Sequence, residues 1–182
     1  MWFCKAFLVS FLLSLSVPHL VAQEIPPSPP VPLSAQLLST YIQIPSITGN
    51  EIIAGVHLKA LFEQAGLHVQ VFSESQDSYN IAASLYPLSS RKPNVIFLSH
   101  MDVVAASDTH LYTHPPFSGA IKDGIVWGRG AIDNKGMTIM QFLATLSFLE
   151  KSKQQDLPYN ITILVVSGEE VGGEKGAKFV VD

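Results

Sequence analysis

Two short runs, one wholly apolar and one apolar except for Thr162, are each followed at once by polar and acidic residues, and they constrain the fold of this chain more than any other feature. The run at 95–98 precedes SHMD at 99–102, and the run at 161–166 precedes SGEE at 167–170. A short, uninterrupted apolar run is typical of a central strand that is buried on both faces. In open α/β sheets, ligands bind beyond the carboxyl ends of such strands. We therefore expect the polar residues of both segments to gather at one edge of a sheet.

The rest of the chain alternates between segments with helical periodicity and segments with strand periodicity. We expect helices over 35–42, 51–65, 135–149 and 176–181. We expect strands over 67–72, 80–86, 95–98 and 161–166, with a tight hairpin over 121–127. This order predicts an α/β domain with a mixed, mostly parallel sheet and helices on both faces.

Local signals predict the ends and the buried faces of the helices. Ser34 is placed to cap the first helix, and Asn50 to cap the second, with Gly66 just past its end. The second helix carries a stripe of apolar residues that we expect to face the core. The stripe consists of Ile52, Ile53, Val56, Ala60 and Leu61. The helix over 135–149 is apolar nearly all round, which predicts a buried helix.

The first 22 residues have the composition of a secretory signal peptide. Lys5 is their only charge, an almost unbroken apolar run covers 6–17, and an LVA tripeptide that suits cleavage ends at 22. The run is shorter than the roughly 20 residues of a membrane span, so we expect removal of 1–22 rather than an uncleaved anchor. The mature protein is then secreted, or delivered to a periplasm or lumen, and has no stable membrane span.

Composition narrows the class of protein further. A proline-rich linker is expected over 23–33, ahead of one domain over 34–182. Cys4 is the only cysteine, so disulfides do not hold the mature chain together. An apolar content of 47% excludes a disordered chain. A net charge of −4 means that the chain lacks the excess of basic residues that nucleic-acid binding requires.

One imidazole and four carboxylates follow the apolar runs or precede the apolar helix. They are His100, Asp102, Asp133, Glu169 and Glu170, with Asp133 inside the glycine-rich segment GRGAIDNKG at 128–136. This donor set suits a divalent metal, most often zinc. Carboxylate-rich sites also accept Co²⁺ or Mn²⁺.

The spacing within each motif suggests separate tasks. His100 and Asp102 share a face of an extended segment, so Asp102 can accept a hydrogen bond from the imidazole nitrogen that does not bind metal. Glu169 and Glu170 are adjacent and must point in different directions, which suits one metal ligand and one general base. The structural alternatives are an ordinary surface pair, a solvated pair of glutamates, and Asp133 as the cap of the following helix.

Three segments, SHMDVV at 99–104, GRGAIDNKG at 128–136 and SGEEVGG at 167–173, resemble the signature blocks of a known family. It is the aminoacylase, carboxypeptidase and deacetylase family of dinuclear zinc hydrolases, which includes the acetylornithine deacetylase and succinyl-diaminopimelate desuccinylase relatives. The stretch HPPFSGAIKDGIVWGRGAIDNKG at 114–136 is most similar to the carboxypeptidase S and N-acyl-amino-acid hydrolase branch. The resemblance covers about 33–182, and the order and spacing of the motifs match as well as their composition.

The resemblance implies a role for each residue. His100 binds one zinc and Glu170 the other, while Asp133 bridges both, with a cis peptide bond between Asp133 and Asn134. Asp102 is the orienting partner of His100, and Glu169 is the general base. The implied activity is hydrolysis of an amide bond in a peptide or an N-acyl amino acid, of the carboxypeptidase or deacylase type. Two zinc ions lower the pKa of a shared water, and Glu169 passes its proton to the leaving amine.

The chain departs from the family near its end. The family uses a further acidic ligand and a late histidine, together with a second domain that mediates dimerisation. Asp182 ends the chain twelve residues after Glu170, and we do not assign Asp182 as a ligand. A truncated, inactive fragment or binding module is therefore the alternative to an enzyme, and a homodimer is expected only where the second domain is present.

We expect the 182-residue product alone to bind zinc weakly and to hydrolyse little, because part of the implied ligand set is missing from it. Incubation of the purified product with zinc and N-acyl amino acids, followed by detection of free amino acid, measures this. Full turnover would contradict the expectation.

Overall fold

The computed structural model describes residues 30–75 and 78–182, within which Val31–Asp182 form one unit. Its α-helices are α1 (Leu33–Ile42), α2 (Ile52–Gln64), α3 (Lys135–Gln154) and α4 (Ala177–Val181). Its strands are β1 (His68–Ser75), β2 (Ser78–Ser84), β3 (Asn94–His100), β4 (Ala120–Lys122), β5 (Ile125–Trp127) and β6 (Asn160–Val166). The expected signal peptide, Cys4 and most of the expected linker lie outside the described residues. Among the residues described, no helix combines the length and apolar character that crossing a membrane requires.

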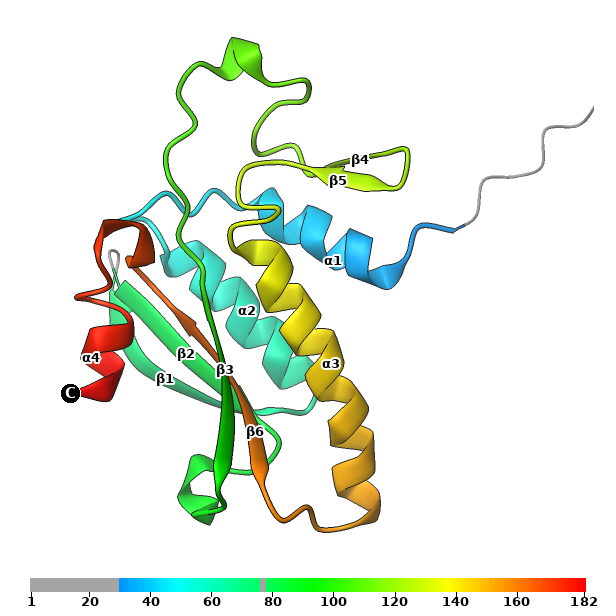
Figure 1. Ribbon diagram of the computed structural model, residues 1–182, viewed down its shortest axis with the longest axis vertical. Coiled ribbons are helices and arrows are strands. Elements are labelled where there is room, and N and C mark those ends of the chain that lie inside the picture. The colour runs from blue at the N-terminus through cyan, green and yellow to red at the C-terminus, as the bar shows by residue number, and fades with distance from the viewer. Residues whose placement is uncertain (1–29, 76–77) are drawn as a thin grey trace, which may run out of the picture. The chain divides into compact units, whose positions relative to one another are not determined.

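The main sheet has the strand order β1-β2-β6-β3 (Figure 1). β6 pairs with β3 in parallel and with β2 antiparallel, and β2 pairs antiparallel with β1. The α/β class and the mixed sheet are confirmed, but among these strands the parallel pairing is the exception. β2 follows β1 after two residues, and so short a connection joins only antiparallel neighbours.

The position of β3 differs from the prediction of a buried central strand at 95–98. Within the described residues β3 lies at the edge of the sheet, and β6 lies inside it with every residue buried. The four apolar side chains at 95–98 are between 42% and 55% exposed. An apolar run indicates a strand, but it does not specify how many neighbours that strand has. The prediction for 161–166 is confirmed.

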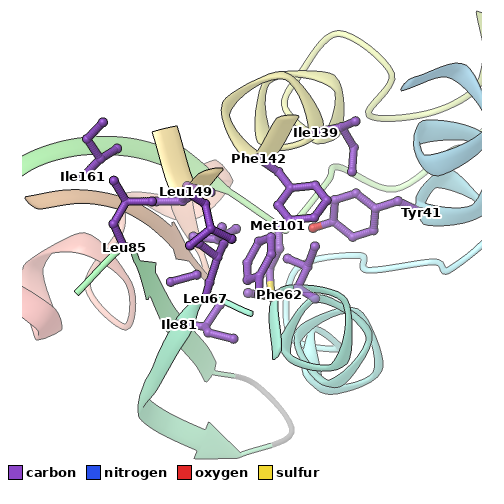
Figure 2. Packing of buried hydrophobic residues seen from close by; sticks show 14 of the residues in the cluster. Tyr41, Phe62, Leu67, Ile81, Leu85, Met101, Ile139, Phe142, Leu149 and Ile161 are labelled. Carbon is purple, nitrogen blue, oxygen red and sulfur yellow. The ribbon is translucent and has the colours of Figure 1, made fainter. Parts of the chain in front are cut away.

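Helices pack on both faces of the main sheet, as predicted. α2 and α3 cover one face, where Phe62 and Phe142 meet with ring centroids 5.3 Å apart beside Tyr41 of α1 (Figure 2). On the other face, Ala177 and Val180 of α4 pack against a small cluster formed by Ala82, Leu164 and Val166. The larger cluster lies between the helices and the sheet and supports the strand ends that carry the polar residues.

The helix ends differ in detail from the sequence prediction. Pro32 occupies the cap position of α1 and Glu51 that of α2, so Ser34 and Asn50 are not the caps. Gly66 lies just beyond α2 with a positive φ of 86°, as expected of a residue that ends a helix. The predicted hairpin is also present, because Asp123 and Gly124 form the turn between β4 and β5 with φ of 53° and 77°.

The buried face of α2 matches the predicted stripe only in part, because Ile52 and Leu61 pack against the core but the face is rotated. Ile53 and Val56 are 67% and 48% exposed, whereas Ala54, Leu58 and Phe62 are buried. α2 is apolar on more than one face, so periodicity alone did not identify the face that contacts the sheet.

α3 also differs in part from its prediction, which was a helix over 135–149 buried on every side. It extends to Gln154, and Met137 and Met140 are 42% and 58% exposed, so it is not buried on every side.

The orientation of α2 is testable with two substitutions. Leu58→Ala removes a fully buried side chain, so we expect it to lower the free energy of unfolding by about 2–5 kcal/mol. Ile53→Ala is the matched control on the exposed face, and we expect a change below about 0.5 kcal/mol. Urea unfolding followed by circular dichroism measures both. Equal losses at the two positions would contradict the observed orientation.

Candidate metal centre

The candidate site lies where β3 and β6 end at the same edge of the sheet (Figure 1). The parallel register pairs His100 with Val166, which are the last residues of the two strands. The chain therefore leaves both strands side by side, and the 3₁₀ helix η3 (Glu169–Val171) follows β6 there. The turn that precedes α3 brings Asp133 to His100. The predicted gathering of polar residues at one sheet edge is thus present.

Three of the predicted residues form a compact cluster of donor atoms. His100, Asp133 and Glu170 each offer an atom, and these atoms lie within 4.8 Å of one another. The Nε2 atom of His100 is 3.0 Å from Oδ1 of Asp133. The three residues come from β3, from the turn before α3 and from η3, so only the tertiary fold brings them together.

The hydrogen bonding of His100 leaves one ring nitrogen suited to a metal. Its Nδ1 atom lies 3.0 Å from the backbone oxygen of Asp102, and a carbonyl oxygen only accepts hydrogen bonds. Nδ1 therefore carries a proton, and in the neutral ring the lone pair is on Nε2, which faces Asp133. An imidazole held in this way beside two carboxylates is a donor set that fits a divalent metal.

Asp102 is the buried link between these segments. Its side chain is fully buried, and its Oδ1 atom is 3.4 Å from Nδ1 of His100. The backbone N–H groups of Glu169 and Glu170 donate to Oδ1 and Oδ2 of Asp102, each at 3.1 Å. Burial opposes the charged form of Asp102, but His100, these two backbone donors and Thr48 together outweigh burial and hold its pKa below the usual value. The expected proximity of Asp102 to Nδ1 is observed, with the backbone oxygen as the nearer acceptor.

The two adjacent glutamates both stay close to the cluster. Glu169 places Oε2 3.6 Å from Nε2 of His100 while its side chain remains 57% exposed. Burial and the negative charges of Asp133, Asp102 and Glu169 raise the pKa of Glu170, although His100 opposes them. Several carboxylates that repel one another in this way provide the local negative charge that attracts a cation.

Asp133 does not act as a helix cap. Asn134 occupies the cap position of α3, and no side-chain hydrogen bond caps that helix. The capping interpretation of Asp133 is therefore wrong, and its side chain is 72% exposed, with Oδ1 directed at His100. The peptide bond between Asp133 and Asn134 is cis, as the family resemblance implied.

Sequence reasoning missed two residues that support the site. Lys135 is fully buried at the start of α3, and its Nζ donates to the backbone oxygens of Tyr41 at 3.0 Å and Ile44 at 2.6 Å. Burial lowers the pKa of Lys135 to about 7. The hydroxyl of Thr48 donates to Oδ2 of Asp102 at 3.0 Å. Lys135 could have been noticed in the sequence, because a lysine is unusual at the start of an apolar helix. No sequence pattern indicated Thr48.

A family model matches the part of the chain that carries the cluster. The profile described as Peptidase family M20/M25/M40 matches residues 96–182, which include every residue of the cluster. The succinyl-diaminopimelate desuccinylase of Methylorubrum extorquens is 35% identical over 150 residues, covering 80% of this chain and 38% of that protein. The chain therefore spans well under half the length of this curated relative.

Solved structures show the same fold. The M20 family metallo-carboxypeptidase Sso-CP2 from Sulfolobus solfataricus superposes with a TM-score of 0.65 at 25% identity, over 78% of this chain and 32% of that chain. The YXEP protein of Bacillus subtilis, described as a dinuclear metal binding peptidase from the M20 family, has a TM-score of 0.56 at 14% identity over 81% and 37%. At that identity, the second likeness supports the fold alone.

We expect the imidazole of His100 to titrate near pH 9 in the metal-free protein. Burial favours the neutral ring, but hydrogen bonds and charge from Asp102, with a further bond to Asp133, raise its pKa to about 9. Because this pKa lies above the unfolded value of about 6.5, the stabilisation is complete below pH 6.5 and is lost as pH rises through 9. Imidazole chemical shifts measured against pH test this, and Asp102→Asn should lower the midpoint. A midpoint at or below the unfolded value would contradict the geometry.

Proposed function

The chain belongs, through residues 96–182, to the peptidase family M20/M25/M40, and on that premise we propose that it acts in the metal-dependent hydrolysis of a C–N amide bond. The observation that carries the proposal is the convergence of His100, Asp133 and Glu170, whose donor atoms lie within 4.8 Å of one another. These residues come from three segments far apart in sequence. Their convergence at the carboxyl ends of two parallel strands is the arrangement that a ligand site in such a sheet uses.

We propose zinc as the metal, with two ions in the complete site. His100 and Glu170 would each hold one ion, and Asp133 would contact both, because a carboxylate has two oxygens that can bind separate cations. When bound, the metals supply Lewis-acid activation of water and of the amide carbonyl. Co²⁺ and Mn²⁺ suit the same donors, since carboxylate-rich sites discriminate weakly among them.

Glu169 is the residue that we propose as general base. Its carboxylate lies 3.6 Å from His100 and remains 57% exposed, so both solvent and a substrate can reach it. Its backbone N–H is fixed on Asp102 at 3.1 Å, which holds the start of this side chain next to the cluster. A carboxylate in this position can take a proton from water and then deliver it to the leaving nitrogen.

Asp102 would act only through His100. It is fully buried and lies beside Nδ1, so it holds the ring with Nε2 directed at Asp133. A partner of this kind keeps the imidazole in one tautomer and one orientation.

The substrate class that we propose is a peptide or an N-acyl amino acid. The relatives support this class by their names, since a desuccinylase and a metallo-carboxypeptidase both cleave an amide bond. Within this substrate class, we further propose specificity of the carboxypeptidase or deacylase type. Export by a signal peptide remains a prediction, because 1–22 lie outside the described residues. A homodimer remains a prediction for a protein that includes the second domain.

The protein purified from its native source tests the function. We expect it to release amine from at least one of N-succinyl-diaminopimelate, an N-acetyl amino acid and a dipeptide. We also expect chelation to abolish the activity and zinc to restore it. With Glu169→Gln introduced into the native gene, kcat should fall by about 10²–10⁴-fold while bound metal is retained, because the proton shuttle is lost.

Glu150→Gln is the matched control, since Glu150 is exposed on α3 and pairs only with Lys153 among the interactions described. Its kcat should equal that of the wild type. Hydrolysis that survives complete metal removal, or a fully active Glu169→Gln variant, would refute the proposed mechanism.

A further inference from the structure

The carboxylate of Asp102 receives hydrogen bonds from two separate parts of the fold. On one side, the backbone N–H groups of Glu169 and Glu170 donate to it at 3.1 Å each. On the other side, the hydroxyl of Thr48 donates to Oδ2 at 3.0 Å, across 54 positions in sequence. A carboxylate turns freely about its last bond unless donors hold both oxygens. Thr48 supplies the side-chain donor that opposes the two backbone donors.

The segment that carries Thr48 is held firmly against the segment that carries Asp102. Ile47 and Val103 form a parallel bridge, in which the backbone N–H of Val103 donates to the oxygen of Ser46 at 2.9 Å. The N–H of Thr48 donates to the oxygen of Val103 at 3.2 Å. Ser46 also donates through its hydroxyl to the backbone oxygen of Met101 at 2.6 Å. Because these bonds flank Asp102, the hydroxyl of Thr48 has a fixed position relative to that residue.

The turn after Thr48 is fixed as well. The N–H of Asn50 donates to the oxygen of Ile47 at 2.9 Å, and the N–H of Gly49 donates to Oε2 of Glu51 at 3.0 Å. Glu51 is fully buried, so the acceptor side of this second bond is anchored in the interior. Thr48 therefore sits in a segment with little freedom to move away from Asp102.

The two backbone donors, the N–H groups of Glu169 and Glu170, lie in a short element between glycines rather than in a segment fixed by several hydrogen bonds. They lie in η3, which is flanked by Gly168 and Gly172 in the left-handed region at φ of 65° and 101°. If η3 supplied the only hydrogen bonds to the Asp102 carboxylate, the orientation of the carboxylate plane would change with any movement of that short element. The side chain of Asp102 is fully buried, so no solvent water is in contact with it to replace a missing donor.

We propose that Thr48 is a positioning residue for the metal centre, because its hydroxyl fixes the plane of the Asp102 carboxylate and thereby the ring of His100. This inference rests on the proposed function, since it takes His100 as a metal ligand. Thr48 itself lies outside the cluster of donor atoms, and among the hydrogen bonds of the described residues its hydroxyl is linked to the cluster through Asp102. Loss of the hydroxyl is expected to leave the ligands in place but to leave the imidazole less well oriented.

The test is a metal titration on native protein that has first been stripped of metal. Thr48→Val removes the hydroxyl and nearly keeps the volume, and Co²⁺ binding is followed by its visible absorption. We expect the affinity for Co²⁺ to fall about 10–100-fold, the usual effect of losing an orienting partner behind a ligand. Thr48→Ser keeps the hydroxyl and should bind Co²⁺ as the wild type does. A purely structural role would lower the unfolding midpoint but leave the affinity of the folded protein unchanged.

Thr40→Val is the matched control. Thr40 is exposed on α1, and its hydroxyl donates to the backbone oxygen of Gln36 at 3.0 Å, so the same chemical change occurs away from the site. Its affinity for Co²⁺ should be that of the wild type. If Thr48→Val does not fold, Thr48→Ala compared with Thr48→Ser decides the question by the same titration.

The outcomes separate the two proposals. Unchanged Co²⁺ affinity in folded Thr48→Val, beside a wild type that binds Co²⁺, would overturn the role of Thr48 alone. Equal weakening in Thr48→Ser would do the same, because the hydroxyl would then not be the cause. A wild type that binds neither Co²⁺ nor Zn²⁺ would overturn the proposed function, and the role of Thr48 with it.

Discussion

The buried carboxylate of Asp102 is the interaction on which the candidate site depends. It accepts hydrogen bonds from Thr48 and from the backbone of Glu169 and Glu170, and it lies beside His100. A buried carboxylate without donors is costly, so these segments and the ionised state of Asp102 stabilise one another. His100 and Glu170 are thus held through one residue that offers no donor atom to the cluster itself.

The sheet and α3 supply the frame around that carboxylate. The register of β3 and β6 brings the two strand ends level, and the N–H of Met101 continues the pairing to the oxygen of Val166 at 2.9 Å. Lys135 connects the start of α3 to the end of α1 and the segment that follows it, two residues after Asp133. Acidic side chains therefore meet on a rigid base while their outer atoms stay accessible. That combination of a fixed base and an accessible negative cluster suits the capture of a cation.

Local patterns predicted much of the fold, but not its arrangement. The strand over 161–166 and the turn at Asp123 and Gly124 follow from short-range signals, and the structure confirms both. The order of strands does not follow from such signals, and so an apolar run at 95–98 was wrongly expected to lie inside the sheet. The predicted buried face of α2 was correct only in part. A helix that is apolar on more than one face can bury any of them, and packing selects Leu58 over Ile53.

The sequence by itself determined which residues could form the site, because His100, Asp133 and Glu170 stand in motifs whose residue types already suggest a metal. Only the tertiary structure decided how they are held. Thr48 contacts Asp102 across 54 positions, and Lys135 reaches Tyr41 across 94. A lysine at the start of an apolar helix marks Lys135 as unusual, but the partner in neither contact follows from a local pattern, because each contact joins two segments far apart in sequence.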